Sequence, residues 1–175
     1  MTTLELKNIC KQFGNKYVLD DITFAAHKGQ CIGVIGSNGA GKSTLLSVII
    51  NTLVPEKGRL FIDNRELNKT FDLTLKRQLG AIVNRPHLVE QLSIQEFLEY
   101  IARIYNILNY NERIDSLMKY LMGDYQVVKH RPIRLLSTGM KQKVAFASTI
   151  LHKPGLLVLD EPLNGIDASS AQKNY

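Results

Sequence analysis

The chain has 175 residues, 45% apolar and 22% charged, which is typical of a globular domain with its own core. No apolar run approaches the roughly 20 residues that cross a bilayer, and the first residues lack a signal-peptide pattern, so we expect a cytosolic protein. The net charge of +6 suits an anionic ligand, but the basic residues are dispersed and no aromatic stacking motif accompanies them, so a nucleic-acid function is not expected. The spacing of cysteines and histidines does not indicate a metal site, so a metal-cluster function is not expected either.

Short strands are predicted in the first part of the chain. Apolar residues between positions 4 and 9, and again at 22 and 24, predict two strands with polar turns at Asn15 and at Asp20–Asp21. The apolar run at 30–35 predicts a short buried strand, and the run at 45–50 predicts an apolar helix.

Between this strand and this helix lies a phosphate-binding motif. Residues 36–44 fit Gly-x-x-x-x-Gly-Lys-Ser/Thr, the P-loop, in which glycines let successive N–H groups face phosphate oxygens. The helix that follows presents its positive end to the same anion. Lys42 can reach the β- and γ-phosphates, and the Ser43 hydroxyl can ligate Mg²⁺. The expected phosphate-binding residues are Gly36, Ser37, Asn38, Gly39, Ala40, Gly41, Lys42, Ser43 and Thr44.

The middle of the chain changes from strand to helix. Residues 59–63 predict a strand closed by a turn at Asp63–Asn64, and residues 79–83 predict a second short buried strand. Ser93-Ile-Gln-Glu96 is a capping box that begins a helix whose apolar face extends to Leu108. Asn111 is expected to cap the next helix.

Two carboxylates follow the last apolar strand. Residues 156–159 are Leu-Leu-Val-Leu, and Asp160 and Glu161 come directly after them in a Walker B arrangement. Ligands bind at the carboxyl ends of parallel strands, so Asp160 is placed to hold Mg²⁺ and Glu161 to polarise an attacking water as general base. A plain strand end is the alternative for such a string taken alone, and the P-loop upstream favours the functional interpretation.

Residues 136–140, Leu-Ser-Thr-Gly-Met, resemble the Leu-Ser-Gly-Gly-Gln signature of ATP-binding-cassette (ABC) ATPases, with Thr138 and Met140 as the departures. Residues 141–143, Lys-Gln-Lys, resemble the basic continuation in exporter-type members. A helix cap at Ser137 without further function is the alternative. Residues 11–14 look like the family's A-loop, so Phe13 would stack on adenine with Val18 nearby, unless Phe13 is a core residue. Residues 162–167 resemble the D-loop.

The resemblance covers the whole chain and implies a fold. That fold is α/β, a P-loop NTPase (RecA-like) core with an N-terminal antiparallel β subdomain and an inserted α-helical subdomain. Residues 1–84 and 151–175 would form the core and β subdomain of one ABC ATPase domain. Residues 85–150 would form the helical subdomain that carries the signature.

The resemblance also implies a mechanism and partners. ATP and Mg²⁺ would be the cofactors, and two such domains would sandwich two ATP molecules head to tail. Ser137 and Gly139 of one domain would contact the γ-phosphate held by the P-loop of the other. A transmembrane permease subunit would dock near residues 84–98 and hold the protein at the inner face of the cell membrane. A non-transport ABC protein and a catalytically weak regulatory module are the alternatives.

Two departures from the family pattern concern catalysis. The family has Gln after the strand at 79–83, where this chain has Asn84, so the amide expected to reach Mg²⁺ or the attacking water is one methylene shorter. The family also carries a histidine roughly thirty residues beyond the catalytic Glu, but only 14 residues follow Glu161 and none is histidine. We therefore expect an incomplete domain that lacks the last strands of the core, binds ATP and hydrolyses it poorly.

Overall fold

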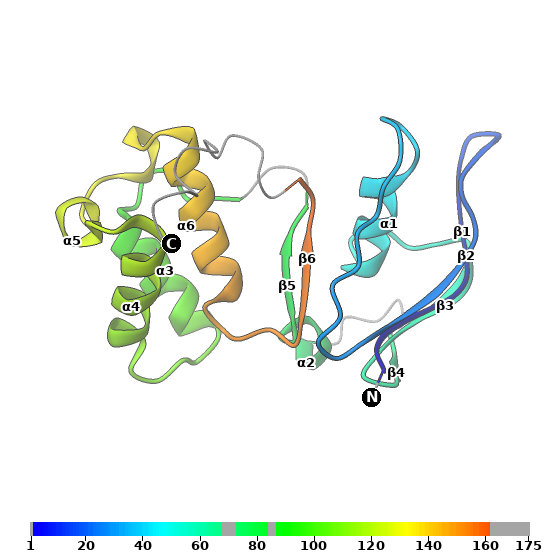
Figure 1. Ribbon diagram of the computed structural model, residues 1–175, viewed down its shortest axis with the longest axis horizontal. Helices are drawn as coiled ribbons and strands as arrows, with labels where there is room; N and C mark the ends of the chain where they lie inside the picture. The colour runs from blue at the N-terminus through cyan, green and yellow to red at the C-terminus, as the bar shows by residue number, and fades with distance from the viewer. Residues whose placement is uncertain (1, 68–72, 84–86, 162–175) are drawn as a thin grey trace. The chain divides into compact units, whose positions relative to one another are not determined.

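The computed structural model describes residues 2–67, 73–83 and 87–161. By compactness the chain divides into two units, Met1–Val83 with Gly155–Asp160, and Asn84–Pro154 with Glu161–Tyr175. Figure 1 labels the elements of both units. They are called unit 1 and unit 2 in that order.

Unit 1 contains an antiparallel sheet with the strand order β2-β1-β3-β4. Its strands are β1 (Thr2–Phe13), β2 (Lys16–His27), β3 (Lys57–Ile62) and β4 (Arg65–Glu66). Phe13 pairs with Lys16, so the expected turn at Asn15 is confirmed. The turn at Asp63–Asn64 is also confirmed, and both residues have positive φ (46° and 61°), as a tight hairpin requires.

A second, parallel pair of strands completes the described β-structure of unit 1. Strand β5 (Leu79–Ile82) pairs in register with β6 (Leu156–Leu159). Helix α1 (Lys42–Ile49) packs against β6 and β2, and the short helix α2 (Leu73–Lys76) precedes β5. The core of this unit combines side chains of both sheets and of α1, among them Leu6, Leu19, Leu45, Val48, Leu79 and Val158.

Three expectations about unit 1 are wrong. Residues 30–35 do not form a strand, and Ile35 is 97% exposed. Strands β5 and β6 are only partly buried, and Leu157 is exposed. The strand at 30–35 and the burial of β5 and β6 fail for the same reason, because an apolar run becomes a buried strand only where neighbouring strands pair with it. Within the described residues, nothing pairs with residues 30–35, and β6 pairs only with β5. Asp20–Asp21 lies inside β2, at a bulge, rather than in a turn.

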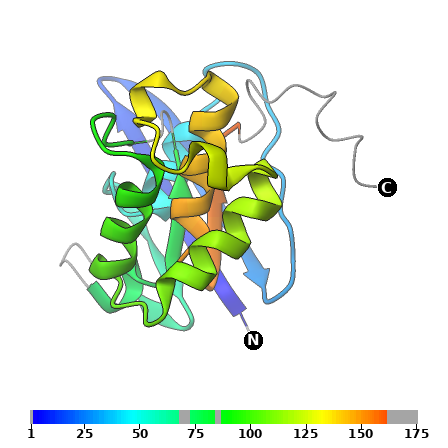
Figure 2. The same ribbon diagram turned by 90° about the vertical axis from the view of Figure 1, so that its left-hand side faces the viewer.

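Unit 2 is helical, and Figure 2 shows its helices from a second direction. It contains α3 (Ile94–Ile104), α4 (Tyr110–Met122), α5 (Tyr125–Val128), a 3₁₀ turn η1 (Ile133–Leu135) and α6 (Thr138–Ile150). The helices enclose a core in which the fully buried side chains include Ile94, Leu98, Ala102, Met118, Ile133 and Val144. These side chains form one contiguous hydrophobic cluster, the core of unit 2.

The capping box at Ser93 is confirmed, because its hydroxyl accepts from Glu96 N–H and the Glu96 carboxylate accepts from Ser93 N–H. Two boundaries differ from expectation. Helix α3 ends at Ile104, so Leu108 is exposed and not on its apolar face. Helix α4 begins after Asn109, whose backbone is left-handed (φ 51°), and not at a cap by Asn111. Asparagine tolerates this conformation, which separates the two helices.

Candidate functional site

The N-terminus of α1 is open to an anion. Residues 31–40 are exposed, and α1 begins at Lys42 directly after Gly41. Gly41 has left-handed φ of 95°, no side chain caps the helix, and no acidic residue lies in its first turn. The first N–H groups of a helix have no partner within the helix, and its dipole favours negative charge there. This end of α1 therefore has the donors and the electrostatics of a phosphate site.

Strand β2 contacts the last residue of the loop that precedes α1, residues 36–41, which we call the phosphate loop. A β-carbon added at Gly41 would lie 2.7 Å from the Val18 carbonyl oxygen and 3.1 Å from its Cγ1, with Leu19 Cδ2 at 3.3 Å. Only glycine fits so close to another backbone, and only glycine adopts this φ without strain. The structure thus places Val18 against the phosphate loop.

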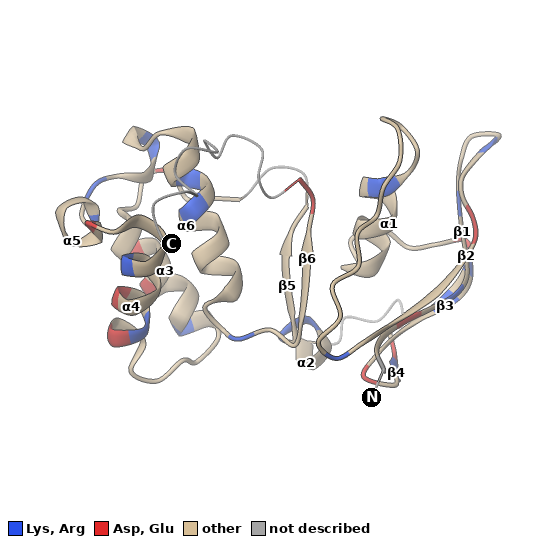
Figure 3. Cartoon of the chain, viewed as in Figure 1, with Lys and Arg blue, Asp and Glu red and all other residues tan. Residues whose placement is uncertain are grey.

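Lys42 lies folded over the loop that precedes it. Its Nζ atom donates to the carbonyl oxygens of Gly36 at 2.8 Å and Ser37 at 2.9 Å. An ammonium group has three donors, so one remains for a ligand held by the loop. The basic residue at the start of α1 is visible as a blue turn in Figure 3.

Asp160 is located at the carboxyl end of the parallel strand pair. Its N–H donates to the Ile82 carbonyl at 2.7 Å, which continues the ladder of β5 and β6 by one residue. In Figures 1 and 3 the carboxyl end of β6 and the start of α1 lie at the same end of unit 1. Glu161 follows with a left-handed backbone (φ 46°) and an exposed side chain. For glutamate this conformation is uncommon, and such positions concentrate at functional sites.

Phe13 is not a core residue. It ends β1 with 52% of its surface exposed, and Lys11 Nζ lies 5.4 Å from its ring centroid. Lys11 also forms an ion pair of 2.6 Å with Glu56. The exposed part of the ring, away from Lys11, is therefore accessible to a flat ligand.

Ser137 caps α6 in unit 2. Its hydroxyl accepts from Met140 N–H at 3.3 Å, and its carbonyl accepts from Lys141 N–H at 2.9 Å. Gly139 lies in the first turn, where no acidic residue is present. Lys141 Nζ bonds Glu90 at 2.7 Å, a contact that sequence analysis did not find because the two residues are distant in the chain. The cap itself is as predicted, and it leaves the N–H groups of Thr138 and Gly139 without helical partners.

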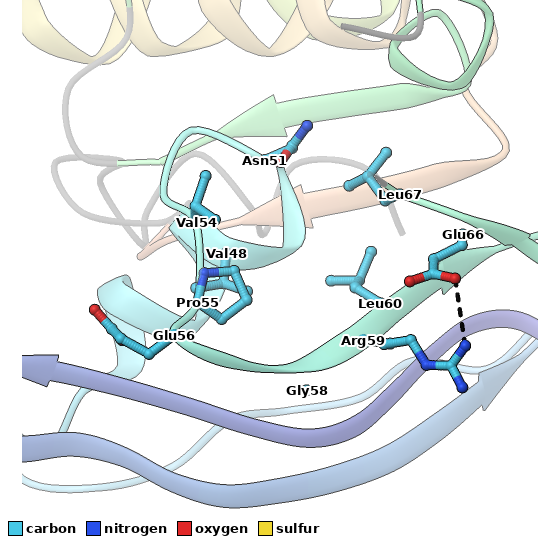
Figure 4. A pocket seen from close by; sticks show the side chains of 10 residues that line it. All are labelled: Val48, Asn51, Val54, Pro55, Glu56, Gly58, Arg59, Leu60, Glu66 and Leu67. Carbon is cyan, nitrogen blue, oxygen red and sulfur yellow. Dashed lines mark hydrogen bonds and ion pairs between the residues drawn. The ribbon is translucent and has the colours of Figure 1, made fainter. Parts of the chain in front are cut away.

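A separate hollow of about 480 Å³ in unit 1 contains none of the predicted site residues. Figure 4 shows its lining, which includes an ion pair of 3.5 Å between Arg59 and Glu66. The lining residues are Val48, Asn51, Val54, Pro55, Glu56, Gly58, Arg59, Leu60, Glu66 and Leu67. We assign the candidate site to the phosphate loop rather than to this hollow, because the loop has open donors and a free cationic hydrogen.

Some expectations fall outside the described residues. They are Asn84 and the D-loop segment 162–167. Within residues 2–67, 73–83 and 87–161, no helix has the length and apolarity to cross a bilayer. No group of three or more His, Cys, Asp and Glu side chains in those same ranges could hold a metal ion.

The sequence profile described as "ABC transporter" matches residues 19–164, most of the chain. The chain belongs to the ABC transporter ATP-binding family. The uncharacterised ABC transporter ATP-binding protein YhcH of Bacillus subtilis (strain 168) is 33% identical over 98% of this chain and 55% of YhcH. A second such protein of that organism, YybJ, is 33% identical over 94% of this chain and 73% of YybJ. The chain therefore spans about half to three quarters of these two relatives.

A solved ATP-binding subunit of an ABC transporter has the same fold as this ABC chain. It superposes with a TM-score of 0.85 at 31% identity, covering 97% of this chain and 70% of the other. The family predicted from the P-loop, the signature and the Walker B acids is thus confirmed. The predicted fold class, a P-loop core with an antiparallel sheet and a helical subdomain, is confirmed as well.

Proposed function

We propose that this ABC chain binds Mg-ATP at residues 36–44 and hydrolyses it to drive transport through a separate transmembrane permease. The observation that supports this most directly is the open N-terminus of α1, over which Lys42 is folded. The free N–H groups of the loop would bind the phosphate oxygens, and the remaining hydrogen of Lys42 would reach the β- and γ-phosphates. Phe13 would stack on the adenine, with Val18 holding the loop.

The residues present fit a magnesium ion. Mg²⁺ prefers oxygen ligands and retains several waters, and the Ser43 hydroxyl and the Asp160 carboxylate are ligands of that kind. Ser43 is exposed at the start of α1, and Asp160 is half-buried after β6. The Asn84 amide would be a further oxygen ligand. When bound, Mg²⁺ neutralises the charge of the β- and γ-phosphate oxygens.

Glu161 would act as the general base. Its exposed carboxylate would accept a proton from the water that attacks the γ-phosphorus, while Lys42 would stabilise the charge on the equatorial oxygens. Ser137 and Gly139 of a second nucleotide-binding domain would approach the same phosphate with the N–H groups at the start of α6. Turnover would then require a dimer, formed by two copies or by two different chains.

A transport role implies a place in the cell. The permease would hold this chain at the inner face of the membrane and would contact it near residues 84–98. The Lys-Gln-Lys run at residues 141–143 supports an exporter, because it resembles the basic continuation of exporter-type members.

The test is Mg-ATP turnover by the purified 175-residue chain over a range of protein concentrations, beside Glu161→Gln. We expect ATP binding in both variants and only weak turnover in the wild type, since the family's histidine is absent from this sequence; that turnover should rise with concentration and be lost in Glu161→Gln. Binding without turnover at any concentration would instead favour a regulatory ATP-binding module. Absence of ATP binding in the wild type would overturn the proposal.

A further inference from the structure

Two neighbouring bulges distort the hairpin of β1 and β2. Leu6 pairs with Phe24 and Ile9 with Ile22, so β1 has one extra residue in that interval. Lys11 then pairs with Leu19, so β2 has one extra residue in the next interval. A bulge places two residues opposite one and bends the strand. The two bulges compensate each other, which restores the register on either side.

Asn8 and Asp21 are the left-handed residues of these bulges, with φ of 52° and 53°. Asn8 Nδ2 donates to Asp21 Oδ1 at 2.7 Å. Each backbone N–H also finds an acceptor on the opposing strand: Asn8 N–H donates to Thr23 Oγ1 at 2.9 Å, and Asp21 N–H to Cys10 Sγ at 3.4 Å. Asn and Asp are the non-glycine residues that tolerate this backbone best. The side-chain bond therefore joins the two bulges into one unit.

Strand β3 is adapted to the same distortion. Gly58 has φ of 92°, and a β-carbon on it would lie 2.4 Å from the Asn8 carbonyl oxygen. The register between β1 and β3 also shifts between Lys7 and Cys10. The distortion thus involves three strands, and the bulge in β1 cannot move alone.

The bulge in β2 is directly followed, toward the hairpin turn, by the residues that support the phosphate loop. Leu19, two residues from Asp21, is 4% exposed in the core that also contains Leu45 of α1. A further register shift leaves Val18 between the paired residues Leu19 and Tyr17, and its carbonyl oxygen is the atom closest to the Gly41 position. A shift of one residue exchanges the two faces of a strand. Without the bulge at Asp21, Val18 and Leu19 would present the wrong faces to Gly41 and to the core.

We propose that Asn8 and Asp21 are positioning residues of the nucleotide site, because their joined bulges set the course of β2 at Val18 and so the conformation of Gly41 at the start of α1. Neither residue touches the nucleotide in this scheme. They act through Val18 on the loop that would bind the phosphates, so their effect is common to every phosphate ligand. The inference rests on the proposed function of the loop.

The experiment compares two probes, ATP and inorganic tripolyphosphate, by calorimetry with Mg²⁺. Asp21→Ala and Asn8→Ala are expected to weaken both probes by the same factor, about tenfold. Asp21→Asn keeps an acceptor oxygen and a residue that tolerates the left-handed backbone, so it should bind both probes as the wild type does. The matched control is Asn64→Ala, which also removes a left-handed asparagine (φ 61°) from this sheet but at the turn between β3 and β4. It should lower thermal stability and leave both affinities unchanged.

The outcomes separate this inference from the proposed function. If the wild type binds both probes and Asp21→Ala binds them equally well, the positioning role is wrong. If Asp21→Ala weakens ATP alone, the bulge acts on Phe13 and not on the loop, which also overturns the inference. If the wild-type protein binds neither probe, the proposed function is overturned, and this inference with it. Should the alanine variants not fold, Asn8→Gly removes only the side-chain bond and keeps the left-handed backbone, and it should still weaken both probes equally.

Discussion

The carbonyl oxygen of Val18 occupies the place where Gly41 would have a side chain, at 2.7 Å from the position of an added β-carbon. The phosphate loop and β2 are therefore packed backbone against backbone. This contact explains why the last loop residue before α1 has to be glycine, for a reason separate from its positive φ.

Gly41→Ala is expected to lower the free energy of unfolding by about 2–4 kcal/mol, from left-handed strain together with the close contact. It should also weaken ATP binding. Two matched variants divide these causes. Gly39 has φ of 80° with open space around it, and Gly33 has neither a positive φ nor a neighbour within 4 Å. In urea unfolding, Gly39→Ala should lose about 1–2 kcal/mol and Gly33→Ala almost nothing. Equal losses for Gly41 and Gly39 would contradict the backbone contact.

Lys42→Ala should weaken ATP binding about tenfold or more, because a charge-assisted hydrogen bond to phosphate contributes about 1.5–3 kcal/mol. Its effect on unfolding should be small, since the two carbonyls it bonds belong to exposed loop residues. Lys28→Ala, at an exposed turn of unit 1, lowers the net charge by the same amount and is the control. Calorimetry with ATP measures both. A similar loss in the two variants would mean that overall charge, not position, governs binding.

Removal of Mg²⁺ should show whether Asp160 contributes to ATP binding through the metal ion, whereas the phosphate loop contributes without it. ATP affinity of the wild type is expected to fall when EDTA replaces Mg²⁺, because the proposed Ser43 and Asp160 ligands then have no ion to share with the phosphates. In Asp160→Asn the difference between the two conditions should largely disappear, with metal-free affinity retained. Asp115→Asn, an exposed acid on α4, should respond to EDTA as the wild type does. An unchanged response in Asp160→Asn would exclude it as a ligand.

The capping box of α3 gives a pH dependence. Hydrogen bonds from the Ser93 backbone N–H and then its hydroxyl hold the pKa of Glu96 below its ordinary 4.5, and nearby His130 acts in the same direction. A pKa that is lower in the folded state contributes stability above the unfolded pKa, and this is lost as the pH falls through the folded pKa. Wild-type stability should therefore decline below about pH 4.5, and Glu96→Gln should decline less.

Two serine variants test the same box. Ser93→Ala should cost about 1 kcal/mol and reduce the acid limb of the stability profile without abolishing it, because the backbone N–H that lowers the pKa of Glu96 most is retained. Ser137→Ala, at the cap of α6 without a partner acid, should cost a similar amount and leave the acid limb as it is. Chemical denaturation between pH 3 and 6 measures both. An acid limb in Ser93→Ala identical to that of the wild type would contradict a contribution of the Ser93 hydroxyl to the lowered pKa of Glu96.

Removal of the Tyr125 hydroxyl is not expected to destabilise the protein. Its side chain is 1% exposed, its hydroxyl has no hydrogen-bond partner among the described residues, and burial raises its pKa to about 12. A buried hydroxyl without a partner costs about 1–3 kcal/mol, so Tyr125→Phe should leave stability unchanged or raise it. Tyr110→Phe is the control, because the Tyr110 hydroxyl accepts a hydrogen bond from Arg103 and its loss should lower stability. Thermal unfolding ranks the two. A clear loss of stability in Tyr125→Phe would indicate a partner, such as an ordered water.

The raised pKa of Tyr125 adds an alkaline signature. Because the folded pKa near 12 exceeds the ordinary value of 10, its contribution to stability is complete below pH 10 and is lost as the pH rises toward 12. Tyr125→Phe should lose less stability than the wild type across this interval. An identical alkaline profile in both would contradict the burial of the phenol.

Much of the candidate site could be predicted because its signals are local. The P-loop, the capping box at Ser93 and the strand before Asp160 are short motifs whose hydrogen bonds and dipoles lie within a few residues of the chain. The resemblance carried by residues 136–140 then led to the family and fold class that the comparisons confirm.

The strand expected at residues 30–35 shows where local reasoning fails. Its composition is that of a buried strand, but a strand exists only when its N–H and C=O groups meet partners on a neighbour. The sequence of residues 30–35 does not indicate whether such a neighbouring strand is present. The same holds for Asp20–Asp21, whose turn-like composition serves a bulge inside β2.

Sequence alone predicted the candidate site of this protein: a P-loop motif with Lys42 at the start of a helix, two acids after an apolar strand and a capped helix that resembles the family signature. The tertiary structure decided what holds these groups in place. The approach of Val18 to Gly41, the bond between Asn8 and Asp21 and the ion pair between Glu90 and Lys141 each join residues far apart in the chain. Such contacts depend on strand register and helix packing, which arise only when the whole core is assembled.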